Sequence, residues 1–192
     1  MQAVRAPTLT ELLKSDLTRF YHFNGNPNRQ AHGLELWRNF VNPRCAPITF
    51  YRLAHNLQHK RLGRPFAKLL TWLNFFLYGI EIDARCTIGP GCYIPHSSGT
   101  VIGAQSIGAQ ALIYQQVTLG GKVIQFEHSG RPVVGDNVIL GSGAKVLGDI
   151  RIGNNVTVGP NSVVMESLPD LVTVLGIPAK VIRSKVGDSH NV

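Results

Sequence analysis

An aliphatic side chain recurs every six residues through most of the second half of the chain, and this period restricts the fold more than any other feature. It occurs at residues 82, 88 and 94, and, after a slip of one residue, at 107, 113 and 119. After a polar segment it resumes at 134, 140, 146, 152, 158 and 164. Neither the alternation of a strand nor the period of a helix produces this spacing. It is typical of a three-sided coil in which each hexapeptide forms one short strand and one corner, and it predicts a parallel β-helix.

The position four residues after each aliphatic residue is mostly small or β-branched, as expected if it faces the same narrow interior. The residues at this position are Cys86, Cys92, Ala111, Val117, Val138, Ala144, Ile150, Val156 and Ser162. We therefore interpret Cys86 and Cys92 as packing residues and not as a metal or redox pair. The chain has three cysteines without paired spacing, which argues against a disulfide framework and predicts a cytoplasmic protein.

The first 80 residues differ from the rest in charge. They contain 11 Lys and Arg against 3 Asp and Glu, whereas residues 81–192 contain 8 of each kind. We expect a helical, basic N-terminal arm at 1–80, a repeat region at 81–166 with a loop at 121–132, and a C-terminal segment at 167–192. Such an arm attracts anions, and an anionic membrane surface at the inner face of the membrane or an acidic substrate would fit it, as would a plain solvated surface. No nucleic-acid-binding module is visible, so nucleic-acid binding is not expected.

The arm shows helical patterns with breaks between them. Thr8 and Glu11 have the spacing of a capping box, and residues 48–62 place apolar side chains near helical spacing. A further helix over residues 66–79 is apolar around most of its circumference, so we expect it to pack against both its own arm and another subunit. The longest apolar stretch, residues 69–80, is too short to span a bilayer.

Two histidines of the arm have a spacing that can bind zinc. His55 and His59 lie four residues apart, but Asn56 stands where a metalloprotease would have its glutamate. We interpret them as a helix-surface pair and expect no metal.

The repeat is broken at two places, each of which contains a histidine. His96 lies in the slip at residues 95–100, and His128 lies in the polar excursion at residues 121–132. Loops that leave a rigid scaffold are where functional residues are usually placed. The two breaks are therefore the predicted site.

Four segments carry a specific family resemblance. They are GIEIDARCTIGPGCYIPHSSGTVIG, VTLGGK, GDNVILGSGAKVLGDIRIGNNVTVGPNSVV and GIPAKVI, within residues 79–182. Together they resemble the serine acetyltransferase group of hexapeptide acyltransferases, and the short arm is similar to that of relatives that acetylate exopolysaccharides, such as the colanic acid acetyltransferases. The resemblance implies a left-handed parallel β-helix, a homotrimer, and acetyl-CoA as donor, bound between neighbouring subunits.

The resemblance also implies site residues. The family's catalytic histidine falls on His96 and its partner carboxylate on Glu81, where glutamate replaces aspartate. A neutral imidazole held by a carboxylate can remove the proton of an attacking hydroxyl. The donor would lie along small residues and one lysine, because the pantetheine arm must approach main-chain amides closely. These positions are Gly120, Gly121, Ser142, Gly143, Ala144 and Lys180.

The acceptor-binding positions depart from the family pattern. Pro95 replaces the aspartate before the catalytic histidine, and Arg131 replaces the family's second histidine. His128 either takes over that second role or is a solvated loop residue. These departures favour a sugar or polysaccharide hydroxyl as acceptor, with L-serine as the alternative. A non-catalytic trimeric scaffold that organises the basic arms is a third hypothesis of a different class.

Overall fold

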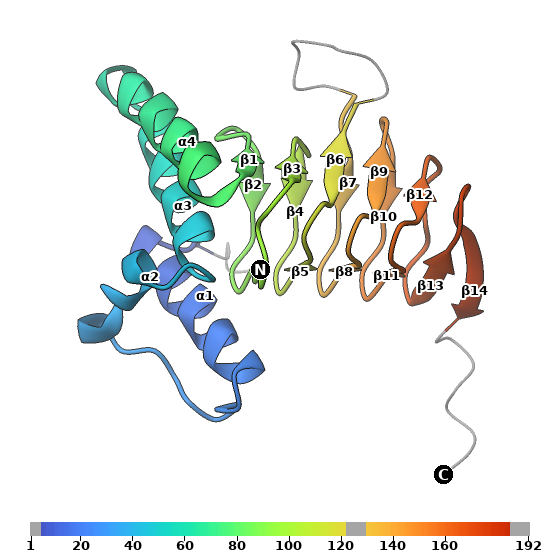
Figure 1. The fold of residues 1–192 in the computed structure, drawn as a ribbon, viewed down its shortest axis with the longest axis horizontal. Helices are drawn as coiled ribbons and strands as arrows, with labels where there is room; N and C mark the ends of the chain where they lie inside the picture. The colour runs from blue at the N-terminus through green and yellow to red at the C-terminus, as the bar shows by residue number, and fades with distance from the viewer. Residues whose placement is uncertain (1–4, 122–129, 185–192) are drawn as a thin grey trace.

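The computed structural model describes residues 5–121 and 130–184, and it consists of a helical arm followed by a solenoid of short strands (Figure 1). The helices of the arm are α1 (Leu9–Phe23), η1 (Gly33–Glu35), α2 (Arg38–Val41), α3 (Ala46–Gln58), η2 (Arg61–Gly63) and α4 (Arg64–Tyr78). The capping box predicted at the start of the first helix is present, because Glu11 N donates to Thr8 Oγ1 and Thr8 N donates to the Glu11 carboxylate. In the described residues, no helix is long and apolar enough to cross a membrane.

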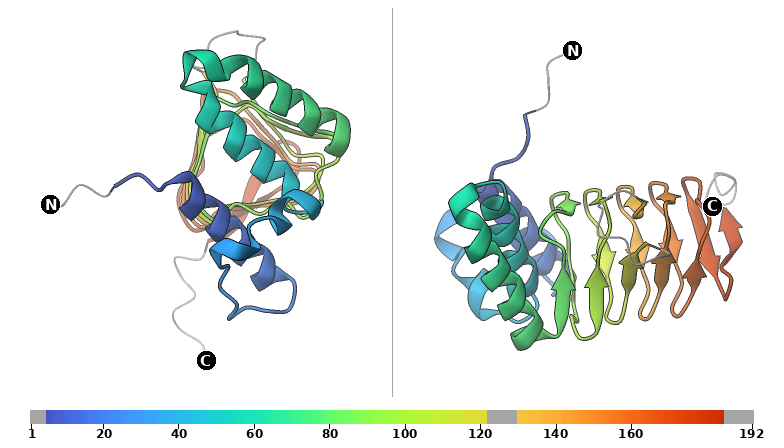
Figure 2. Two further views of the ribbon diagram at one scale, coloured as in Figure 1. Left: turned by 90° about the vertical axis from the view of Figure 1, so that its left-hand side faces the viewer. Right: turned by 90° about the horizontal axis from the view of Figure 1, so that it is seen from above.

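The strands form three sheets, which are the three faces of a left-handed parallel β-helix (Figure 2). The six-residue period and the family resemblance predicted this fold. The first sheet contains β1 (Ile80–Ile82), β3 (Thr100–Ile102), β6 (Thr118–Gly120), β9 (Lys145–Leu147) and β12 (Val163–Val164). The second contains β2 (Thr87–Ile88), β4 (Ser106–Ile107), β7 (Val133–Val134) and β10 (Arg151–Ile152). The third contains β5 (Leu112–Ile113), β8 (Ile139–Leu140), β11 (Thr157–Val158), β13 (Val172–Leu175) and β14 (Lys180–Ser184), the last antiparallel to β13.

The recurring aliphatic side chains stack inside the solenoid. In the first sheet Ile82 pairs with Ile102, and Ile102 pairs with Leu119, all fully buried. The slip in the repeat has two parts, because Ile102 follows Ile94 after eight residues and Ile107 follows Ile102 after five. All nine small or β-branched residues predicted to face the interior are buried as well. The core of this part of the molecule is therefore the set of side chains that the period identified.

Close stacking of the corners explains the small residue after the aliphatic one. At Gly108, a Cβ atom would lie 2.6 Å from the carbonyl carbon of Gly135 in the next coil. No larger side chain fits without moving the backbone of one coil away from the other.

The arm closes the first end of the solenoid, where α3 and α4 lie across the open coil (Figure 2). Tyr51 of α3 is buried against the core, and its hydroxyl accepts a hydrogen bond from Ile88 N (3.1 Å) and donates to Cys86 O. Arg52 donates to the carbonyl oxygens of Ile88 and Gly89. The arm thus satisfies backbone groups that the first coil would otherwise leave without a partner.

Candidate active site

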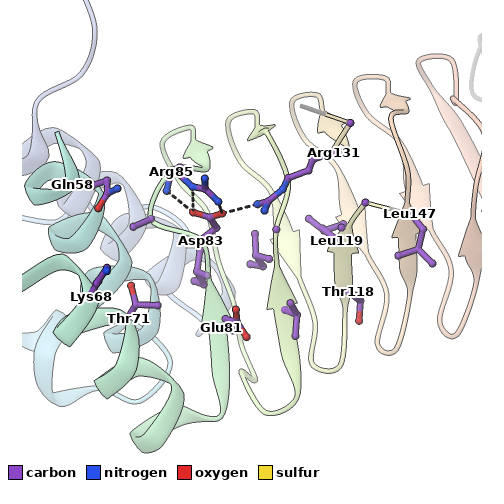
Figure 3. Close-up of a pocket in the computed structure, with 18 of the residues that line it drawn as sticks. Gln58, Lys68, Thr71, Glu81, Asp83, Arg85, Thr118, Leu119, Arg131 and Leu147 are labelled. Atoms are coloured by element: carbon purple, nitrogen blue, oxygen red, sulfur yellow. Dashed lines mark hydrogen bonds and ion pairs between the residues drawn. The ribbon is translucent and has the colours of Figure 1, made fainter. Parts of the chain in front are cut away.

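A cavity of about 800 Å³ lies where α4 meets the side of the first sheet (Figure 3). One wall comes from α4 and α3, and the other comes from the corners between the first and second sheets. Its polar and charged lining side chains are Gln58, Lys68, Thr71, Glu81, Asp83, Arg85, Thr118 and Arg131. The cavity therefore combines three cationic groups with two carboxylates beside an apolar floor.

An ion cluster centred on Asp83 occupies this cavity. Arg131 Nη1 donates to Asp83 Oδ2 at 2.6 Å, and Arg85 donates to the same carboxylate through Nε (3.1 Å) and Nη2 (2.8 Å). Asp83 follows β1 in the first coil, whereas Arg131 follows the loop after β6 (Figure 3). Asp83 therefore holds the side chain of Arg131 across two coils of the solenoid.

The surroundings of Asp83 keep it ionised. Burial alone would raise the pKa of this carboxyl, but the hydrogen bonds from Arg85 and Arg131 outweigh burial and hold the pKa well below its ordinary value. The carboxylate is therefore a permanent anchor for Arg131 near neutral pH.

The two glycines beside Arg131 differ in the space around them. A Cβ atom added at Gly120 would meet no atom within 4 Å, whereas one added at Gly103 would lie 3.0 Å from Leu119 O and 3.7 Å from Arg131 Nη1. Gly120, Gly121, Glu81 and Arg131 all line the cavity, so the structure brings together four of the residues predicted for the site.

The predicted base, His96, lies at a different place from this cavity. It is exposed in the corner that precedes β3, and it does not line the cavity. Its corner is fixed to the start of β1, because Ser97 Oγ donates to Tyr78 O and Gly99 N donates to Gly79 O, both at 2.8 Å. Within the described parts of the single chain, no hydrogen bond joins His96 to Glu81, so their predicted pairing stays a prediction.

The other predicted donor-binding residues lie on the edge that contains His96. Gln116 N donates to Ser98 O, and Gly143 N donates to Gln115 O, so the corners at 95–99, 114–117 and 141–144 stack in one column. Ser142 is half-buried there. Ala144 differs, because it is fully buried and its N–H already donates to Gly141 O. Lys180 begins β14 at the far end and is exposed.

The other histidines considered in the sequence are His55, His59 and His128. His128 lies outside the described residues. His55 and His59 contact each other edge to face, with ring centroids 5.0 Å apart, and His55 Nδ1 lies 2.8 Å from Ala84 O. No group of three or more potential metal ligands occurs among the residues that the structure describes.

Asp83, Arg85 and Lys68 are cavity residues that sequence patterns did not assign. Asp83 follows the aliphatic residue of β1 directly, the place that Gly103 and Gly120 take in the next two coils. A charged residue at a position where the next two coils have glycine could have indicated that Asp83 belongs to a site. Lys68 carries no such signal, because its position depends on how α4 packs against the solenoid.

A solenoid of stacked hexapeptide corners with a cavity at one edge defines a class of protein, the hexapeptide-repeat transferases. The family model described as bacterial transferase hexapeptide (six repeats) matches residues 131–165. A serine acetyltransferase of Helicobacter pylori is 45% identical over 141 residues, which cover 73% of this chain and 81% of that protein. The chain belongs to the serine acetyltransferase family.

Other relatives agree with this assignment. A serine acetyltransferase of Synechococcus elongatus is 44% identical over 143 residues, which are 73% of this chain and 57% of the relative. The structure of a serine acetyltransferase of Neisseria gonorrhoeae superposes with a TM-score of 0.78 at 28% identity, over 92% of this chain and 65% of that one. A serine acetyltransferase in complex with CoA gives a TM-score of 0.76 at 27% identity, over 92% and 70%. The chain thus spans less than two thirds of the length of several relatives it matches.

Proposed function

We propose that this protein is an acetyl-CoA-dependent O-acetyltransferase and that its acceptor is L-serine. The observation that supports the acceptor most directly is the anchored guanidinium of Arg131 in the cavity beside Gly120 and Gly121. Membership of the serine acetyltransferase family and the CoA complex of a structural relative support the donor. This proposal replaces a saccharide as the first choice of acceptor, because the named relatives act on serine.

His96 is the proposed general base, with Glu81 as its partner. A hydroxyl is a weak nucleophile at neutral pH, so its proton must leave as it attacks. The acceptor proton passes to the imidazole while the acceptor oxygen bonds to the acetyl carbonyl carbon. The carbon–sulfur bond then breaks, and the imidazolium returns the proton to the thiolate. The products are the O-acetyl ester and free CoA.

Arg131 is proposed to bind the carboxylate of the acceptor. A guanidinium carries five N–H donors in a rigid fork, so Arg131 can hold Asp83 and a second carboxylate together. Asp83 and Arg131 have only 19% and 17% of their side-chain surface exposed, so an acceptor would meet a guanidinium whose position is already fixed. This arrangement favours a small acceptor with a carboxylate over a neutral hydroxyl compound.

Small residues and stacked corners are proposed to bind the donor. Gly120 leaves open space in the cavity, and Gly121 also lines it. Ser142 and Gly143 lie in the column of corners that contains His96, and Lys180 begins β14. Ala144 contributes by keeping its corner small, since it is fully buried. Acetyl-CoA supplies the activated acetyl group when it is bound.

A homotrimer is part of the proposal. The cavity lies at the carboxyl ends of the strands of the first sheet, and the His96 corner lies at their amino ends. Two neighbouring subunits could place these two sites against each other across one interface. Light scattering at micromolar concentration should give three times the chain mass. A stable monomer would contradict the inter-subunit site.

A saccharide hydroxyl, as in relatives that acetylate exopolysaccharides, is the second candidate acceptor. Pro95 beside His96 favours it, because a carboxylate for the serine ammonium is absent at that position. A lipid-linked saccharide would also give the basic arm a role at an anionic membrane surface.

One assay separates the candidates. The purified protein is incubated with acetyl-CoA and millimolar L-serine, and release of the free thiol is followed. Turnover to O-acetylserine that saturates with L-serine supports the proposal. Thiol release with a saccharide acceptor but not with L-serine would overturn the serine assignment, and no CoA binding by calorimetry would indicate the scaffold.

A further inference from the structure

The outer face of α4 presents an apolar stripe. Leu69, Trp72 and Phe76 are spaced three and four residues apart, so they share one side of the helix. Their exposed fractions are 49%, 58% and 62%, and the rings of Trp72 and Phe76 contact each other with centroids 4.3 Å apart. Three more exposed apolar residues flank the stripe: Phe66, Phe75 and Leu77. The inner side of the helix packs on the arm through buried Ala67 and Asn74.

The charged residues near this stripe in the sequence are all basic. Residues 36–80 contain seven Lys and Arg and no Asp or Glu. Four of these cations are exposed at the beginning of α4 and just before it: Lys60, Arg61, Arg64 and Lys68. Among the described residues none of the four forms an ion pair. Within the parts of the chain that the structure describes, these cations therefore lie beside the apolar stripe without an ion-pair partner.

This charge pattern favours an anionic partner. A contact that pairs two copies of α4 in parallel would set these cations opposite one another, and like charges in a contact oppose association. An anionic bilayer matches both parts of the face, since its phosphates accept the cations and its acyl boundary accepts Leu69, Trp72 and Phe76. Tryptophan is enriched at this boundary because its ring is apolar and its N–H is polar.

We propose that the outer face of α4 docks the protein on anionic phospholipid membranes. The helix lies in the plane of the interface, with Leu69 and Phe76 in the acyl boundary and Lys60, Arg61 and Arg64 at the headgroups. Membrane contact is peripheral, because α4 has 15 residues and is too short to span a bilayer. Trp72 also lines the cavity, so the docked face continues into the candidate active site.

The test is flotation of the full chain with lipid vesicles. Vesicles of phosphatidylcholine alone are compared with vesicles that also contain phosphatidylglycerol, and the fraction of protein that floats is measured. Binding should need the anionic lipid and should fall as salt is raised. The variant K60Q/R61Q/R64Q should partition at least ~30-fold more weakly, because each cation near an anionic surface contributes about 1 kcal/mol.

The apolar part is tested with L69S/F76S, which should weaken partitioning by ~10-fold or more. Leu34→Ser is the matched control, since Leu34 is 93% exposed in η1, outside α4, and it should bind like the unmodified protein. Circular dichroism checks that each variant folds, and light scattering gives its mass. Equal flotation with both vesicle types would overturn the proposal. So would a changed mass of L69S/F76S with unchanged flotation, which would assign the face to a contact between copies.

The vesicle experiment uses neither acetyl-CoA nor an acceptor. Its result is therefore independent of the proposed acetyl transfer, and either proposal can fail without the other.

Discussion

Asp16 of α1 and Arg52 of α3 form a fully buried ion pair at the end of the solenoid. Arg52 Nε lies 2.9 Å from Asp16 Oδ2, Arg52 Nη2 lies 3.1 Å from Asp16 Oδ1, and Cys92 N donates to Asp16 Oδ1 at 3.0 Å. Burial raises the pKa of Asp16, and the guanidinium opposes that effect. The pair therefore joins two helices of the arm to the first coil.

Arg52→Ala should lower the free energy of unfolding by about 3–5 kcal/mol, because it leaves a buried carboxylate without its partner. Chemical denaturation followed by circular dichroism measures the change. Arg38→Ala, at an exposed position of the same arm, is the control. Asp16→Ala/Arg52→Ala should recover part of the loss. Equal stability of the Arg52 and Arg38 variants would refute the anchoring role.

Asp83 should contribute to stability in a pH-dependent way. Its pKa is lower in the folded protein than in the unfolded chain, so its contribution is fully present above about pH 4 and is lost as the pH falls below that value. Thermal melts at a series of acidic pH values should show a smaller acid-induced loss in Asp83→Asn than in the unmodified protein. Asp149→Asn, at an exposed corner, is the control for the loss of one carboxylate. Identical profiles for all three proteins would exclude the effect.

Loss of the proposed base should abolish most turnover. His96→Ala is expected to reduce kcat by at least ~100-fold, the scale of a lost general base. Thiol release from acetyl-CoA with L-serine measures it, and His59→Ala is the control, because His59 lies on the arm and is exposed. Unchanged turnover in the His96 variant would remove His96 from the mechanism.

Arg131 should act mainly on acceptor binding. Arg131→Ala is expected to raise the KM for L-serine by about 10- to 100-fold, the value of hydrogen bonds to a charged group, with a smaller change in kcat. Arg131→Lys should recover little, because lysine lacks the planar fork that holds two carboxylates. Asp83→Asn should raise the same KM less. An equal KM in all variants would show that Arg131 does not contact the acceptor.

Gly120 tests the open space of the cavity. Gly120→Val adds a side chain where a Cβ meets no atom within 4 Å, so the melting temperature should change little. The side chain would occupy the cavity edge, and the KM for acetyl-CoA or for L-serine should rise several-fold. A normal KM for both substrates would place them elsewhere.

The solenoid could be predicted from sequence because one local rule, repeated every six residues, determines it. Ile82, Ile102 and Leu119 stack because each coil repeats the last, and no long-range information is needed. The Asp83–Arg131 contact could not be predicted in this way, since it joins side chains 48 residues apart across a loop. The Asp16–Arg52 pair depends on how helices dock on a coil end, which the repeat does not encode.

The separate position of His96 has a similar cause. His96 and Glu81 both belong to the first coil, and their pairing was implied by the family resemblance, but side-chain directions at a corner depend on the turn. The family resemblance implied their roles. That the cavity and the His96 corner lie at opposite ends of the strands of the first sheet follows only from the three-dimensional structure.

The closed end described for the first coil bears on self-assembly. A stack of identical coils has no natural length, and an open coil end offers unpaired amides and carbonyls on which another molecule could continue the winding. Tyr51, Arg52 and Asp16 occupy those groups at one end. The helices therefore block the addition of a further coil at this end, and they oppose end-to-end polymerisation of the solenoid.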